Sequence, residues 1–118
     1  MTTDQNKKFK DEVLHNVLKQ GKNKKLNDIS LSWIKESAPT KYSYNFTWLG
    51  RPIIQYPQDI VSMQELIWEV KPDIIIETGI AHGGSLIFSA SMLALLDVHD
   101  SIKSEKLIDI RTSKRKVL

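Results

Sequence analysis

The sequence predicts an α/β fold in which helices precede the opening strand–turn–helix unit of a parallel sheet. Three adjacent features support this prediction. Residues 73–77 form a short, unbroken run rich in isoleucine, residues 78–84 are rich in glycine, and residues 85–96 are strongly apolar. A run that is apolar at every position is typical of a central parallel strand buried on both faces. A tight turn and a helix after such a strand indicate the first βα unit of a doubly wound sheet.

The N-terminal part predicts two helices. In residues 3–20, Phe9, Val13 and Val17 recur every four residues, and Gly21 is a natural helix end. A shorter helix is expected over residues 27–36, ended by Ala-Pro-Thr. We therefore assign residues 1–40 to a helical N-terminal extension and residues 41–118 to the sheet-forming domain.

The aromatic segment 41–59 contains two prolines and predicts a turn leading into a short extended stretch. It is either an arm packed across the domain or a lip over a ligand pocket. A helix follows over residues 60–70, with Asp59 as its expected N-cap and Lys71-Pro72 as its end.

Beyond the apolar helix, residues 97–105 predict a polar loop and residues 106–110 a second strand. Residues 111–118 are expected to be a basic tail without a partner. The formal charges of residues 1–25, 26–102 and 103–118 are +4, −5 and +4. The basic ends hold one aromatic residue, Phe9, so this pattern favours solvated ends over a nucleic-acid surface.

Composition excludes several classes. The absence of cysteine removes disulfides and thiolate chemistry, and it fits a reducing cytoplasm, where we expect the protein to reside. No run of eighteen apolar residues occurs, so no membrane span is expected.

The glycine-rich turn is the segment that indicates which ligand the chain binds. A phosphate-binding P-loop requires lysine where Ser85 stands, and a dinucleotide fingerprint requires glycine where Ala81 stands. What remains is acid-x-Gly-x-x-x-Gly, with Glu77 as the acid. A carboxylate there suits the ammonium and sulfonium of S-adenosylmethionine, although Glu77 could instead cap the turn. The predicted cofactor-binding residues of the turn are Glu77, Thr78, Gly79, Ala81, His82, Gly83, Gly84 and Ser85.

Asp109 is a further candidate because it would end the second strand, where related folds hold ribose hydroxyls. The alternative is a solvated acid in a frayed end. No catalytic residue can be named, and no metal site is expected, because His15 and His99 lack companions at ligand spacing.

The residues of three stretches resemble the cephalosporin hydroxylase and rhamnosyl O-methyltransferase family. These stretches are residues 46–55, residues 67–73 and the Glu-Thr-Gly-Ile-Ala-His-Gly-Gly-Ser string that begins at Glu77. The resemblance implies a Rossmann-like, S-adenosylmethionine-dependent O-methyltransferase acting on sugars or small hydroxylated metabolites in surface glycan, glycolipid or antibiotic assembly.

The resemblance extends to the first half of the family's domain only. The family's second strand continues beyond the pattern that remains at 108–111, so we expect a truncated or fragment form whose own activity is doubtful. The full-length family can hold a divalent metal such as Mg²⁺, whose acidic ligands this sequence lacks.

Two other readings compete with the methyltransferase. His82-Gly83-Gly84-Ser85 is similar to an esterase oxyanion loop, but the required G-x-S-x-G elbow is missing. A non-catalytic half-domain that binds a partner is the main alternative. With few strands, the isoleucine run would keep an open edge, which predicts self-association.

Overall fold

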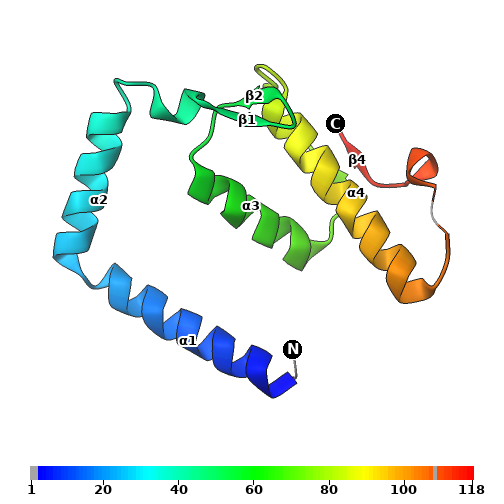
Figure 1. Ribbon diagram of the computed structural model, residues 1–118, viewed down its shortest axis with the longest axis horizontal. Coiled ribbons are helices and arrows are strands. Elements are labelled where there is room, and N and C mark those ends of the chain that lie inside the picture. The colour runs from blue at the N-terminus through cyan, green and yellow to red at the C-terminus, as the bar shows by residue number, and fades with distance from the viewer. Residues whose placement is uncertain (1–2, 108) are drawn as a thin grey trace. The chain divides into compact units, whose positions relative to one another are not determined.

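The computed structural model describes residues 3–107 and 109–118, and it is mostly helical with two small sheets (Figure 1). The chain divides into two compact units between Thr40 and Lys41. The first unit is helical, and the second contains both sheets. The observed architecture is therefore a mixture of helices and strands, as the sequence predicts.

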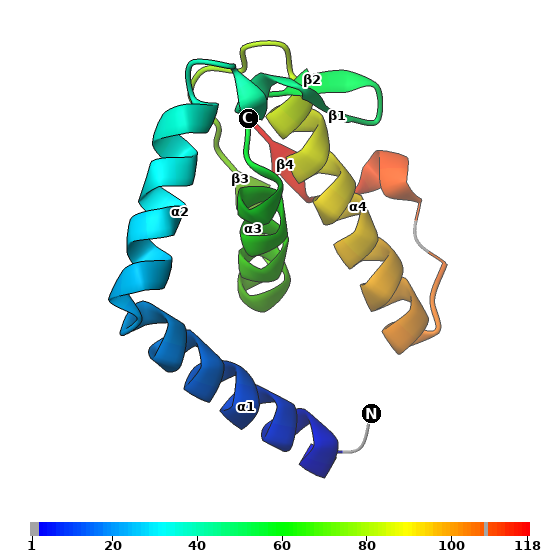
Figure 2. The same ribbon diagram turned by 60° about the vertical axis from the view of Figure 1, so that its left-hand side comes forward.

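The first unit consists of α1 (Thr3–Gly21) and α2 (Lys24–Ser37). The α1 helix ends at Gly21 as predicted, whereas α2 begins three residues earlier than predicted. The cause is Asn23, whose side chain accepts a hydrogen bond from the Leu26 N–H at 3.1 Å and so acts as an N-cap. Figure 2 shows the two helices joined by this short turn.

The second unit begins with the short helix η1 (Tyr42–Tyr44) and an antiparallel hairpin of β1 (Phe46–Trp48) and β2 (Arg51–Ile53). The two-residue loop is Leu49-Gly50, with φ angles of +45° and +80°. Positive φ at both positions is the requirement of a type I′ turn, whose twist matches that of the strands. The predicted turn into an extended stretch is therefore confirmed as a hairpin.

The hairpin packs onto the domain through its aromatic residues. The rings of Trp48 and Phe88 meet edge to face, with centroids 4.9 Å apart. The Trp48 Nε1–H donates to Ser91 Oγ at 3.0 Å. These contacts are those of a packed arm.

The helix α3 (Pro57–Val70) begins three residues before its predicted start. Pro57 stands at the first helical position, where the fixed φ of proline is favourable, and Tyr56 is the N-cap. The expectation that Asp59 caps the helix is wrong, because Asp59 lies inside the first turn. The end is as predicted: Lys71 adopts a left-handed φ of +48°, directly before Pro72.

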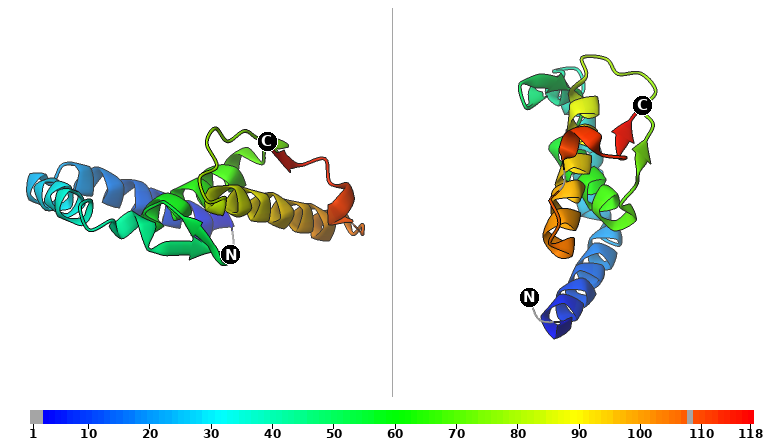
Figure 3. Two further views of the ribbon diagram at one scale, coloured as in Figure 1. Left: turned by 90° about the horizontal axis from the view of Figure 1, so that it is seen from above. Right: turned by 90° about the vertical axis from the view of Figure 1, so that its right-hand side faces the viewer.

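The remaining elements are β3 (Ile74–Ile75), α4 (Gly84–Ser104), η2 (Ile110–Thr112) and β4 (Lys116–Val117). The β3 and β4 strands are parallel, with Ile74 opposite Lys116 and Ile75 opposite Val117 (Figure 3). Flanking hydrogen bonds extend the pairing, since the Glu77 N–H donates to the Leu118 oxygen at 2.8 Å. The βα unit predicted around the glycine turn is thus present, and it returns to a parallel partner.

Two predictions for this region are wrong. Residues 97–104 continue α4 rather than forming a loop, and the helix stops only where Glu105 turns left-handed at φ +53°. Residues 106–110 are not the second strand, although Ile108 lies outside the described residues. The Asp109 carboxylate accepts from the Arg111 N–H at 3.0 Å and its carbonyl from Thr112, which favours a turn over a strand there.

The predicted basic tail has partners. The Arg115 guanidinium, which is 9% exposed, contacts Asp97 at 2.5 Å and Asp100 at 2.7 Å, and both acids belong to α4. The hydrogen bond with Asp100, opposed by burial and reinforced by Asp97, raises the pKa of Arg115 above its ordinary value. This ion cluster fixes β4 against α4, so the idea of a wholly solvated tail is wrong.

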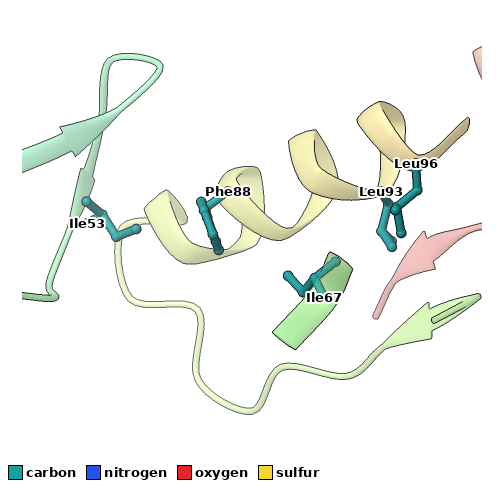
Figure 4. Packing of buried hydrophobic residues seen from close by; sticks show 5 residues of the cluster. All are labelled: Ile53, Ile67, Phe88, Leu93 and Leu96. Atoms are coloured by element: carbon teal, nitrogen blue, oxygen red, sulfur yellow. The ribbon is translucent and has the colours of Figure 1, made fainter. Parts of the chain in front are cut away.

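The hydrophobic core of the second unit gathers around one face of α4 (Figure 4). Ile75 and Val117 pack against it, whereas Ile74 and Ile76 are 54% and 74% exposed. Burial of the strand on both faces is therefore not observed, because the described residues cover only one face of this sheet. The fully buried members are Ile53, Ile67, Phe88, Leu93 and Leu96.

The α4 helix is also long and apolar enough to cross a membrane by length and composition alone. Its buried positions include Phe88 and Leu93 of the core, together with Asp97, which is paired with Arg115. These contacts are those of the central helix of a folded domain.

Candidate functional site

The turn between β3 and α4 has an unusual backbone. Gly79, Ala81 and Gly83 have φ angles of +86°, +39° and +81°. Side chains disfavour this region, so glycine is the natural choice at two of the three positions. The Gly83 N–H donates to the Ile80 oxygen at 2.6 Å, which closes the turn directly before the helix.

Glu77 lies at the carboxyl end of β3, where its main chain is held by the hydrogen bond to Leu118. Its half-buried carboxylate accepts a hydrogen bond from the Ser85 hydroxyl, in the first turn of α4. Among the described residues, no main-chain N–H donates to this carboxylate. The turn is therefore spanned by a side-chain contact that orients Glu77, and the second carboxylate oxygen has no partner among the described residues.

Gly84 is the one glycine of the turn that is buried, and its surroundings give it a packing role. A Cβ atom added there would lie 2.2 Å from the Pro52 oxygen and 2.7 Å from the Ile53 Cα. Only glycine allows the hairpin to cross the start of α4 this closely. Gly84 thus joins the turn to the hairpin by direct backbone contact.

An open cavity of about 270 Å³ lies between the hairpin and the turn. Thr78 and Gly79 of the turn are exposed and do not line it. Sequence reasoning missed Arg51, an exposed residue that shares one face of β2 with buried Ile53; a strand pattern over 51–53 was the available signal. The lining residues are Arg51, Ile80, Ala81, His82, Gly83, Leu86 and Ile87.

Asp109 is not at the end of a strand, so the structural basis for its predicted role is wrong. It precedes η2, and its exposed carboxylate pairs with Arg111 at 2.7 Å. Hydrogen bonds from the Arg111 side chain and main chain hold the pKa of Asp109 below its ordinary value. Its position matches the alternative of a solvated acid.

The described residues contain no group of three or more histidine or acidic side chains that could hold a metal ion. The site that the structure assembles is instead a glycine turn with one oriented carboxylate and a cavity lined by one arginine. The sequence predicted the turn and Glu77, and the structure adds the Ser85 contact and the cavity.

Comparison with known protein families gives a match that includes the whole second unit. Residues 40–118 match the model of the family described as rhamnosyl O-methyltransferase/CmcI. Searches of curated proteins and of solved structures found no match to the chain. The family match covers more than half of the chain, including the hairpin, the turn and α4. The chain belongs to the rhamnosyl O-methyltransferase/CmcI family.

Proposed function

We propose that this chain carries the S-adenosylmethionine-binding part of an O-methyltransferase that acts on a sugar or a small hydroxylated metabolite. The observation that carries the proposal is the Glu77 carboxylate, held by Ser85 at the end of β3 beside a glycine turn. Membership of a family named for rhamnosyl O-methyl transfer supports both the reaction and the class of acceptor.

The residues of the turn fit the cofactor chemically. A carboxylate with a free oxygen suits an ammonium group, because a charge-assisted hydrogen bond is stronger than a neutral one. Glycine at positions 79 and 83 lets the main chain approach a ligand closely. The first N–H groups of α4 have no partners within the helix and can donate to an anionic group.

The bound cofactor would supply an electrophilic methyl group. The chain's own contribution is to bind and orient: Ser85 holds the Glu77 carboxylate, and Gly84 allows the hairpin to cover the start of α4. Positioning of this kind accounts for a large share of the rate in group transfer. The base that takes the proton of the acceptor is not assigned to any residue of this chain.

The architecture supports the same proposal. A β3–α4–β4 unit with a glycine turn after its first strand is typical of the opening unit of a Rossmann-like sheet, which supports the proposal. In this proposal, residues 41–118 form the first half of that domain, residues 1–40 are its helical extension, and the protein acts in the cytoplasm.

The test is a calorimetric titration of S-adenosylmethionine into the purified chain and into Glu77→Gln. We expect saturable binding that Glu77→Gln weakens more than about tenfold, which corresponds to loss of a hydrogen bond to a charged group. Glu69→Gln, the same substitution on an exposed position of α3, is the matched control and should bind like the wild type. Equal affinity in the wild type and Glu77→Gln would rule out the role of Glu77.

A second candidate function is a non-catalytic domain that binds a partner. It is favoured by β3, which pairs with β4 alone among the described strands and so has an open edge that can pair with another chain. Ile74 of β3 and Ile76 just after it are exposed and add apolar surface there. A second copy of this chain would then be the first partner to examine. Sedimentation of the wild type against Ile76→Lys tests this, since self-association through β3 should be lost in the variant, while cofactor binding distinguishes the enzyme.

A further inference from the structure

We propose that the cavity between Arg51 and the glycine turn binds the carboxylate group of a small ligand. The inference rests on the proposed function and deepens it, because it assigns a second ligand contact beside the glycine turn. The cavity includes neither Glu77 nor Ser85 among its lining residues. The contact at Arg51 can therefore be tested separately from the contact at Glu77.

Strand alternation directs Arg51 to this place. Arg51 and Ile53 stand two residues apart on β2 and so share one face of the strand. Ile53 is 1% exposed and packs into the core beside α4. The contact of Gly84 with Pro52 fixes the hairpin over the start of α4. Arg51, the neighbour of Pro52, therefore lies beside the turn and lines the cavity with it.

The chemistry of the lining indicates an anionic ligand with an apolar part. Arg51 is the only permanently charged residue of the lining, and its guanidinium has no ion pair or hydrogen bond among the described residues. None of the described residues that line the cavity is an acid. Ile80, Leu86 and Ile87 supply apolar surface, against which a short aliphatic chain or one face of a sugar ring could pack.

A carboxylate suits this lining better than a phosphate does. The planar fork of a guanidinium matches the two oxygens of a carboxylate, and one arginine balances one negative charge. A phosphate ester near neutral pH carries close to two charges and is usually held by more than one cation or by several main-chain N–H groups. The lining contains one arginine and no lysine.

Two ligands could supply the carboxylate. The first is S-adenosylmethionine, whose α-carboxylate would bind Arg51. The second is an acidic acceptor such as a uronic acid. Two pairs of probes distinguish them: S-adenosylmethionine against its decarboxylated analogue, and glucuronate against glucose.

The experiment measures the affinity of all four probes for the wild type, Arg51→Gln and Arg51→Lys. We expect the wild type to prefer the carboxylate member of one pair by about tenfold. Arg51→Gln should lose that preference while its affinity for the member without a carboxylate stays unchanged, and Arg51→Lys should keep part of the preference. Arg111→Gln, a substitution outside the cavity, is the matched control and should behave like the wild type.

The outcomes separate this inference from the proposed function. If Arg51→Gln loses the preference for the carboxylate only in the first pair, the cavity binds the cofactor. If it loses the preference only in the second pair, the cavity binds the acceptor. Glu77-dependent cofactor binding without any effect of Arg51→Gln would overturn the inference and leave the function standing. Arg51-dependent glucuronate binding by a chain that does not bind the cofactor would do the reverse. Failure to bind any probe would overturn both.

Discussion

Gly84→Ala adds a single methyl group at the most crowded point of the site. The new Cβ would meet the Pro52 oxygen at 2.2 Å, the Pro52 carbonyl carbon at 2.6 Å and the Ile53 Cα at 2.7 Å. All three atoms are main chain, so no side-chain rotation can relieve the contact. The hairpin would have to retreat by roughly 1 Å to restore ordinary van der Waals distances.

The expected loss in the free energy of unfolding follows from the buried contacts that the hairpin makes. Ile53 and Phe88 are 1% and 2% exposed, so a shift of β2 disturbs fully buried contacts. Overpacking of this kind typically costs about 1–3 kcal/mol. Alanine gains up to about 1 kcal/mol over glycine inside a helix, and less at its first position. We expect a net loss of about 2 kcal/mol in the free energy of unfolding.

Urea unfolding followed by far-ultraviolet circular dichroism measures this loss. Ala90→Gly, on an exposed position of the same helix, reports the helix-propensity term alone and should cost about 0.5–1 kcal/mol. If the steric reasoning is wrong, Gly84→Ala would stabilise the chain by a similar amount. A stabilised Gly84→Ala variant would therefore refute the close approach of the hairpin to α4.

Three further predictions concern the hairpin and the ion cluster. Leu49→Asn should stabilise by about 0.5–1 kcal/mol in urea unfolding, because Leu49 is 76% exposed and its positive φ suits asparagine; an unchanged midpoint would contradict the type I′ turn. Arg115→Met should lower the free energy of unfolding by about 3 kcal/mol, because it leaves Asp97 buried and unpaired. Asp97→Asn should cost more stability than Asp100→Asn, because the side chain of Asp100 is 42% exposed. Equal losses in these two variants would argue against the cluster. The Arg115 hydrogen bond holds the pKa of Asp100 below its ordinary value of 3.8, so this stabilisation is complete above that pH and is lost as pH falls through the lowered pKa; thermal melts of Asp100→Asn should therefore depend less on pH in the acid range than those of the wild type.

Local patterns predicted the elements that depend on neighbours in the chain. The spacing of Phe9, Val13 and Val17 indicated α1, and Lys71-Pro72 indicated the end of α3. The isoleucine run, the glycine turn and the apolar run after it predicted β3 and α4 in their observed order. Glu77 could be selected because a carboxylate between a strand and a glycine turn suits the ammonium group of the predicted cofactor.

The sequence patterns gave wrong predictions in the C-terminal segment. The short stretch around Ile110 has the composition of a strand, but Asp109 accepts hydrogen bonds from neighbouring residues, and the chain forms a turn there instead. Lys116–Val117 has the composition of a charged tail, yet it pairs with β3, and the preceding Arg115 forms ion pairs with two acids on α4.

Local sequence patterns were sufficient to predict that the helices and the glycine turn exist and to select Glu77, because periodicity and backbone freedom act over a few residues. The pairing of β4 with β3, the need for glycine at position 84 and the place of Arg51 beside a cavity follow from the fold alone. Each of these depends on contacts between residues that are 29 or more positions apart. Such contacts are set by the packing of whole elements, which no local pattern records.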